Sequence, residues 1–208
     1  MPFIVYEGDN LCSKSTQLEL QAKHLAQSYR VKTVKTATPT EIGLFAKNYS
    51  LKHPSDTIRN FYLYMADVVS LTQDIKAETN DYDFILCDRY FWTTLAVNNI
   101  QNDKRFDPII REMLERGDLV YPDQTVFFRV SSEEQKRRAC KRAMNSLDKL
   151  SMNEDFHNRF EAEYERLSKT YPGWVIIDTD KKTADEIACD VESKIVRDKI
   201  CWDNPFGK

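Results

Sequence analysis

The sequence contains no apolar run long enough to span a bilayer, and it has no internal repeats or low-complexity segments. The first predicted strand begins at the N-terminus, with no charged leader, apolar signal-peptide core or transit composition in front of it. These absences argue against a membrane-spanning protein and against a repeat architecture. We therefore expect a globular chain that has no membrane partner.

Cysteine is scarce and irregularly placed. The five cysteines form no CxxC pair and no zinc-binding spacing. Their odd number and wide scatter argue against a disulfide framework, so we expect reduced thiols and a cytoplasmic protein. The cysteines are Cys12, Cys87, Cys140, Cys189 and Cys201.

An excess of positive charge is also missing. The formal net charge is −3, so the chain carries no global signature of binding to polymeric nucleic acid or to an anionic membrane. Its basic residues gather locally instead, which favours a small anionic ligand. With 208 residues and 41% hydrophobic content, the chain is expected to form a single domain over residues 1–208.

A phosphate-binding loop comes directly after the first predicted strand. Gly8, four further residues and the run Ser13-Lys14-Ser15 form the Walker A pattern, with Ser13 in place of its second glycine. In that pattern backbone N–H groups surround phosphate oxygens, and the next helix directs its positive N-terminal end toward the anion. We expect Lys14 to reach the β- and γ-phosphates of ATP and the Ser15 hydroxyl to bind Mg²⁺. The expected nucleotide-binding residues are Gly8, Asp9, Asn10, Leu11, Cys12, Ser13, Lys14, Ser15 and Thr16.

Apolar runs that alternate with helical stretches predict an α/β fold. Because the strands are apolar on both faces, we expect the five-stranded parallel sheet of a P-loop NTPase, covered by helices on both sides. Ser131 and Glu134 fit a capping box, and Thr183 fits an N-cap. Strands are predicted at 3–7, 31–36, 84–87, 125–130 and 174–178, and helices at 14–28, 41–48, 58–76, 92–99, 109–116, 136–142, 156–167 and 183–196.

Charged residues come directly after the third predicted strand. Ligands of an open parallel sheet bind beyond the carboxyl ends of its strands, so Asp88 and Arg89 should face the phosphate loop. Asp88 can hold a Mg²⁺-bound water or orient the attacking oxygen, and Arg89 can bind the acceptor's phosphate through two hydrogen bonds. The alternative is a capping aspartate beside a surface arginine.

Two further groups of residues are candidates for nucleotide contacts. Arg138 and Arg142 lie four residues apart on one face of a predicted helix, opposite an expected phosphate or else forming a solvated basic face. Tyr64 belongs to an aromatic helix from which one ring can stack on a base, although such rings commonly pack in a core. The histidines His24, His53 and His157 form no triad or metal-ligand spacing and receive no role.

Together these residues resemble the thymidylate kinase family of nucleoside monophosphate kinases. The resemblance keeps the family's order and covers nearly the whole chain, through residues 3–17, 39–43, 85–90, 132–142, 147–159 and 175–179. Residues 58–62 and 88–92 are locally more similar to the UMP-CMP-kinase-2 branch. The resemblance implies transfer of the ATP γ-phosphate to a pyrimidine (deoxy)nucleoside monophosphate, with dTMP as the leading acceptor.

The resemblance also implies cofactors, partners and roles. It implies ATP with Mg²⁺, a mobile lid at about residues 138–155 and a homodimer packed through helices. By position, Lys14 and Ser15 serve Mg-ATP, while Asp88 and Arg89 serve the metal and the acceptor phosphate. Arg138 is placed to stack on adenine, and Arg142 is the lid arginine.

The chain departs from the family pattern mainly where the acceptor binds. Asn10 replaces an aspartate that meets the acceptor sugar, and Leu11 leaves the lid as the source of any catalytic arginine. The Pro39 loop lacks the usual phosphate-binding arginine, and Asp67-Val68 stands where an Asn-Arg pair reads thymine. Arg59 is a candidate replacement cation. The expected substrate-binding residues are Asn10, Pro39, Arg59, Tyr64 and Arg89.

Three alternatives to a dTMP kinase stay open at this point. The acceptor can be another or a modified pyrimidine nucleotide, because the base-reading arginine is missing. The chain can be a deoxynucleoside kinase, although that class typically carries Glu-Arg-Ser where this chain has Asp88-Arg89-Tyr90. It can also be a nucleotide-binding protein with impaired catalysis, which Ser13 and Asn10 favour and the intact Lys14 disfavours.

Overall fold

The computed structural model describes residues 1–102, 104–140 and 153–195. Five parallel strands form one sheet in the order β2-β3-β1-β4-β5, as the sequence predicts a parallel sheet of five strands. The central strand β1 is buried along its whole length, which is typical of a parallel sheet covered on both faces. The strands are β1 (Phe3–Glu7), β2 (Val31–Lys35), β3 (Phe84–Asp88), β4 (Gln124–Arg129) and β5 (Trp174–Asp178).

Polar side chains begin several of the helices. Thr40, Asp56 and Asn153 cap α2, α3 and α8, because each side chain accepts a hydrogen bond from a backbone N–H of the first turn. Among the described helices, none combines the length and apolar character needed to cross a membrane. The described helices are α1 (Lys14–Leu25), α2 (Glu41–Lys52), α3 (Thr57–Ala77), α4 (Phe91–Asn102), α5 (Asp107–Glu115), α6 (Ser132–Ala139), α8 (Glu154–Thr170) and α9 (Ala184–Ile195).

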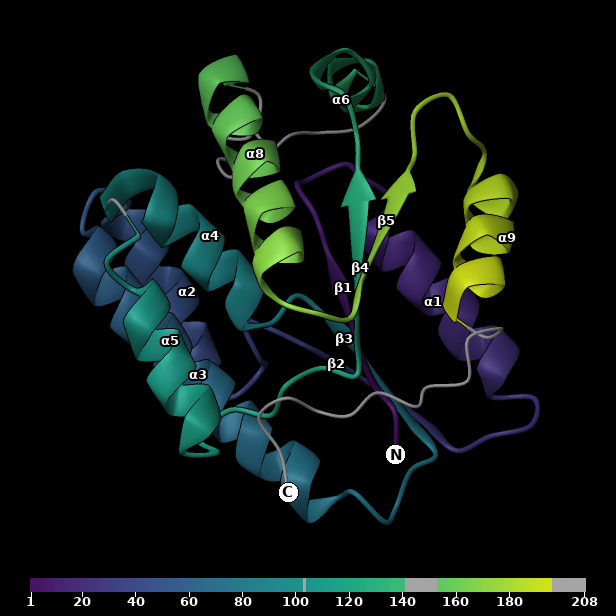
Figure 1. The fold of residues 1–208 in the computed structure, drawn as a ribbon, viewed down its shortest axis with the longest axis horizontal. Coiled ribbons are helices and arrows are strands. Elements are labelled where there is room, and N and C mark those ends of the chain that lie inside the picture. The colour runs from purple at the N-terminus through teal and green to yellow at the C-terminus, as the bar shows by residue number, and fades with distance from the viewer. Residues whose placement is uncertain (103, 141–152, 196–208) are drawn as a thin grey trace.

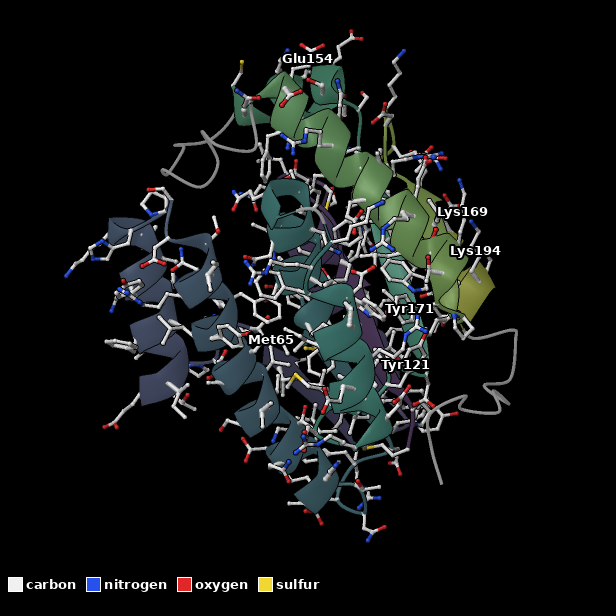
Figure 2. All side chains as sticks on the ribbon, turned by 60° about the vertical axis from the view of Figure 1, so that its left-hand side comes forward. Met65, Tyr121, Glu154, Lys169, Tyr171 and Lys194 are labelled. Atoms are coloured by element: carbon white, nitrogen blue, oxygen red, sulfur yellow. The ribbon has the colours of Figure 1, made fainter. Side chains whose placement is uncertain are left out.

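Helices cover both faces of the sheet (Figure 1). On one face, α1 and α9 pack around an apolar cluster that includes Leu18 and Val191. On the other face, α3, α4, α5 and α8 enclose a larger cluster, of which Met65, Tyr121 and Tyr171 are labelled in Figure 2. Burying one large apolar side chain contributes roughly 1.5–3 kcal/mol, so these two clusters fix the helices against the sheet.

The carboxyl ends of β1 and β3 lie side by side and bring distant segments together. Tyr6 pairs with Asp88 in the sheet register, and the Arg89 N–H donates to the Tyr6 carbonyl at 3.0 Å. The loop after β1 and the residues after β3 therefore share one edge of the sheet, where ligands bind in this architecture.

Most helix boundaries differ from the sequence prediction by one to four residues; the helix predicted at 136–142, for example, begins at Ser132, directly after its cap Ser131. Two of the differences have a clear local cause. The helix expected at 41–48 continues to Lys52, and it ends before Pro54 because the residue that precedes a proline is disfavoured in the helical conformation. The helix expected at 14–28 ends at Leu25, since the N–H groups of Gln27 and Ser28 donate to carbonyls three residues back and tighten the chain into a turn.

The predicted capping box at Ser131 forms only in part. The Ser131 hydroxyl accepts from the Glu134 N–H at 3.2 Å, but the Ser131 N–H donates to Asp180 instead of Glu134. The Glu134 carboxylate is occupied by Arg137 and Arg138, which bind it more strongly because they are charged. A reciprocal box forms instead at the predicted cap Thr183, where side chain and backbone exchange hydrogen bonds with Glu186.

Candidate active site

The loop between β1 and α1 has a backbone shaped for phosphate. Gly8 has a φ of +142°, and a Cβ there would lie 2.6 Å from the Phe128 carbonyl oxygen, so glycine is required. Leu11 and Ser13 have φ values of +66° and +74° in the left-handed region. Ser13 thus adopts the conformation for which the Walker A pattern uses glycine, and its Cβ makes that conformation strained.

Lys14, Ser15 and Asp88 meet at the edge of the sheet. The Asp88 Oδ2 accepts a 2.6 Å hydrogen bond from the Ser15 hydroxyl, and its Oδ1 lies 4.0 Å from the Lys14 Nζ. Lys14 is buried, and its ammonium also donates to the Asp9 carbonyl oxygen at 3.5 Å. The fold therefore joins the predicted phosphate-binding lysine to the two predicted metal ligands across 73 residues of sequence.

Ser15 and Asp88 form a donor set that fits Mg²⁺. The Asp88 Oδ1 is buried, and it has no hydrogen-bond partner among the described residues. Mg²⁺ keeps several waters and takes one or two protein oxygens beside substrate phosphates. Within the described ranges, no group of three or more His, Cys, Asp or Glu side chains could hold a metal by itself. The residues present suit a metal that arrives with a nucleotide.

Arg89 also lies in the left-handed region, with a φ of +66°. Its Nη2 donates to the Asn10 side-chain oxygen at 2.8 Å, and its Nη1 donates to the Thr93 hydroxyl at 3.1 Å. Thr93 in turn donates to Glu7 at 2.6 Å, and burial raises the pKa of that carboxyl. These contacts hold the guanidinium beside the phosphate loop.

A pocket of about 360 Å³ opens beside Arg89. Tyr64 lines it, and the Tyr64 hydroxyl is 2.8 Å from the Ser50 hydroxyl. Lys35 and Lys47 line it as well and add positive charge. The pocket therefore offers cations for a phosphate and an aromatic ring for a base. The described residues that line it include the predicted substrate residues Asn10, Tyr64 and Arg89.

Two predicted substrate residues lie elsewhere, because the described residues that line the pocket do not include Pro39 or Arg59. Arg59 is exposed, pairs with Asp56 at 3.1 Å and donates to the Tyr49 hydroxyl. The sequence pattern favoured Arg59 as a replacement cation and gave no signal for Lys35 or Lys47. Those lysines belong to no motif, so only the fold places them at the pocket.

The Asp67-Val68 pair is buried and has a structural role. Val68 is fully buried in the core between α3 and the sheet. Asp67 is also fully buried, and it accepts hydrogen bonds from the backbone N–H and the hydroxyl of Thr38. These contacts tie the loop before α2, whose Thr36 and Ala37 line the pocket, to α3, and the pair supplies no cation.

Arg138, on α6, reaches across the phosphate loop. Its Nη1 donates to the Leu11 carbonyl at 2.9 Å and to the Ser13 hydroxyl at 3.1 Å, and its Nη2 donates to the Thr179 carbonyl at 2.5 Å. The predicted adenine-stacking arginine is thus next to the nucleotide loop. Arg142 and most of the predicted lid lie outside the described residues.

His157 belongs to the site although its sequence context assigned it no role. Its Nδ1 is 3.0 Å from the Asp9 Oδ2, and both side chains are buried. The two residues are 148 positions apart in the chain. No local spacing could have predicted the contact, because it depends on where α8 packs against the loop.

The chain matches the family model described as thymidylate kinase over residues 7–189. It is 26% identical over 206 residues to a probable thymidylate kinase of Methanococcus aeolicus, covering 95% of this chain and 97% of that protein. It is 30% identical over 185 residues to a thymidylate kinase of Nostoc sp., covering 84% and 85% of the two chains.

Solved structures agree with the fold. A thymidylate kinase from Candida albicans superposes with a TM-score of 0.78 and 22% identity, covering 96% of this chain and 92% of that one. A thymidylate kinase from Ehrlichia chaffeensis superposes with a TM-score of 0.70 and 19% identity, covering 92% and 96%. At these identities the superpositions establish the architecture alone. The local similarity to the UMP-CMP-kinase-2 branch stays a prediction.

Proposed function

Because the chain belongs to the thymidylate kinase family, we propose that it transfers the γ-phosphate of ATP to dTMP at the carboxyl edge of its sheet. It is an ATP-dependent nucleoside monophosphate kinase. The observation that carries the proposed site is the meeting of Lys14, Ser15 and Asp88 beside a pocket that contains Arg89.

The phosphate loop serves ATP. The turn at Gly8 and the start of α1 direct backbone N–H groups at the β- and γ-phosphates. Lys14 follows the transferring phosphoryl group and stabilises the charge that develops on its oxygens. Arg138 lies where it can contact the adenine side of the nucleotide, and Arg142 remains the predicted lid arginine.

Mg²⁺ is the metal that this donor set would take. The Ser15 hydroxyl and the Asp88 carboxylate would hold it, directly or through water, together with ATP oxygens. When bound, it neutralises charge on the phosphate oxygens. Because Asp88 and Arg89 are adjacent in the chain, the metal and the acceptor phosphate are served by neighbouring residues.

The pocket serves the acceptor. Arg89 binds the dTMP phosphate, and Asn10 holds the guanidinium in position through the 2.8 Å contact. Lys35 and Lys47 supply positive charge near the acceptor phosphate, in place of the arginine that the Pro39 loop lacks. Tyr64 offers a ring on which the base can stack, an arrangement worth roughly 1–3 kcal/mol per base in proteins that bind single-stranded nucleic acid.

We also propose a homodimer that packs through α2 and α3. Phe45 and Tyr62 are 59% and 54% exposed, and they stand among further exposed apolar residues on the same two helices. A large exposed apolar patch favours association. The further residues are Ile42, Leu44, Leu51 and Ile58. Sedimentation equilibrium tests this: a dimer is expected, and a monomer over the whole concentration range contradicts it.

A reducing, cytoplasmic location is consistent with the cysteines. The described ones are free thiols, and two of them are buried. They are Cys12, Cys87, Cys140 and Cys189.

A coupled assay of ADP release tests the function directly. The panel is Mg-ATP with dTMP, dUMP, dCMP, CMP, UMP or thymidine. We expect the highest kcat/KM with dTMP. If thymidine were the one acceptor of the panel that is turned over, the chain would be assigned to the nucleoside kinases. Equal or better turnover of another monophosphate would replace dTMP as the acceptor and leave the reaction class unchanged.

A further inference from the structure

A buried charged pair lies against the phosphate loop. The side chains of His157, on α8, and Asp9, in the loop, are 4% and 5% exposed, and the Nδ1–Oδ2 distance is 3.0 Å. Asp9 comes directly after Gly8 in the loop, so a contact that holds its side chain also holds the loop backbone in place. The chemistry assigned to this site so far uses neither side chain.

Asp9 connects α6 and α8 to the phosphate loop and to Lys14. Gln135, on α6, donates through its Nε2 to the Asp9 Oδ2 and to the Asn10 carbonyl, both at 3.0 Å. The Asn10 N–H donates to the Asp9 Oδ1 at 2.7 Å. The Asp9 carbonyl oxygen receives the Lys14 ammonium at 3.5 Å. A displacement of Asp9 would therefore move the acceptor that orients Lys14.

The surroundings of His157 favour its charged form. The hydrogen bond to Asp9 is the largest cause that raises its pKa, and a backbone hydrogen bond with Val130 raises it further, while burial lowers it. The buried 3.0 Å contact between the His157 Nδ1 and the Asp9 Oδ2 thus joins α8 to the phosphate loop.

The neighbouring charges leave Asp9 as the main anionic partner of this ring. Glu161 is one turn further along α8, both of its carboxyl oxygens are buried, and neither has a hydrogen-bond partner among the described residues. Burial raises the pKa of Glu161 to about 8, which keeps it largely protonated near neutral pH. Arg129 on β4 and Glu165 on α8 complete the charged groups that face Glu161.

We propose that His157 is a positioning residue for phosphoryl transfer, which through Asp9 holds the phosphate loop and Lys14 in the orientation that receives ATP. The inference rests on the proposed function of the loop. It assigns to α8, which begins where the predicted lid ends, a direct contact with the ATP site. The acceptor pocket depends on this contact less directly, because Asp9 reaches Arg89 only through Asn10, and Arg89 is also held by Thr93.

The test compares His157→Leu, which removes the donor, with His157→Asn, which keeps a neutral donor, and with the control His24→Asn on the exposed end of α1. We expect His157→Leu to raise the KM for ATP about tenfold, the size of a lost charge-assisted hydrogen bond, with a clearly smaller rise in the KM for dTMP. We expect the wild-type KM for ATP to rise as the pH rises through the His157 pKa. That rise should be absent from His157→Asn and kept in His24→Asn.

Several results would overturn the proposal. One is a His157→Leu enzyme with the wild-type KM for ATP. Another is an equal rise of both KM values, which is the sign of a merely structural role. If His157→Leu does not fold, His157→Asn decides, because an unchanged pH profile in that variant contradicts the proposal. Failure of the proposed function would look different, because the wild type would then turn over no monophosphate. In that case the Kd for ATP, measured by calorimetry for wild type and variants, would still test the role of His157.

Discussion

The Ser13 hydroxyl accepts a 3.1 Å hydrogen bond from the Arg138 guanidinium. Ser13 has a left-handed backbone, which costs a residue with a Cβ roughly 1–2 kcal/mol. Arg138 also binds the Leu11 carbonyl and two oxygens of Thr179, so α6 fastens the loop at the point where the Walker A pattern has glycine. The exchange is therefore accommodated by a contact that glycine cannot make.

Ser13→Gly should raise kcat/KM for ATP a few-fold. The change relieves about 1 kcal/mol of backbone strain and lets phosphate approach more closely, while Arg138 keeps its other acceptors. Ser13→Ala is the matched control, since it keeps the strain and removes the hydroxyl, and it should lower kcat/KM. Steady-state kinetics with varied ATP measures both, and a Ser13→Gly enzyme weaker than Ser13→Ala would refute the strain argument.

Arg89→Ala should raise the KM for dTMP at least about tenfold, because a charge-assisted contact with the acceptor phosphate is lost. The KM for ATP should change much less, since Lys14 keeps its contacts with Asp88 and Asp9 and the loop loses only the contact at the Asn10 side chain. Arg59→Ala is the control, because Arg59 pairs with Asp56 away from the pocket. A larger effect at Arg59 than at Arg89 would place the acceptor phosphate elsewhere.

Removing the metal should abolish turnover, and Asp88→Asn should increase the Mg²⁺ concentration needed for half-maximal rate. The amide keeps the shape of the side chain but loses the charge that attracts a hard cation. Titrating Mg²⁺ at saturating nucleotide measures the shift. The same Mg²⁺ dependence in Asp88→Asn and wild type would remove Asp88 from the metal site.

Glu161 should make the protein less stable as the pH rises. Its pKa is about 8 when folded against 4.5 as the ordinary value, so the folded chain binds the proton more tightly. Stability then falls as the pH climbs from about 4.5 to about 8. Glu161→Gln removes this proton while keeping the shape, so its Tm should decline less over that range. Parallel Tm curves for the two proteins would contradict the assignment.

Local patterns explain why so much of the fold could be predicted. Each strand is a short apolar run, and the Walker A frame determines the loop and the helix after the first of them, so the order of elements can be inferred from neighbours in sequence. The meeting of Ser15 and Asp88 was predictable too, because residues at the carboxyl ends of adjacent parallel strands share one edge.

The rest of the site depends on tertiary packing. Lys35 lies on an edge strand and Lys47 on an exposed helix, and neither belongs to a motif that marks a ligand contact. In the sequence, Glu7 is simply the last residue of a predicted strand. In the structure it is fully buried and accepts hydrogen bonds from Tyr90, Thr93 and Tyr164. Such contacts become visible only once α4 and α8 are placed on the sheet.

The rate of phosphoryl transfer by Lys14→Ala, in a single-turnover experiment with Mg-ATP and dTMP, tests the site most directly. We predict a fall of about a hundredfold or more against wild type, because the lysine stabilises charge that develops on the moving phosphate. Circular dichroism should show an unchanged fold. A folded Lys14→Ala enzyme that transfers phosphate at the wild-type rate would contradict the phosphate loop as the catalytic site.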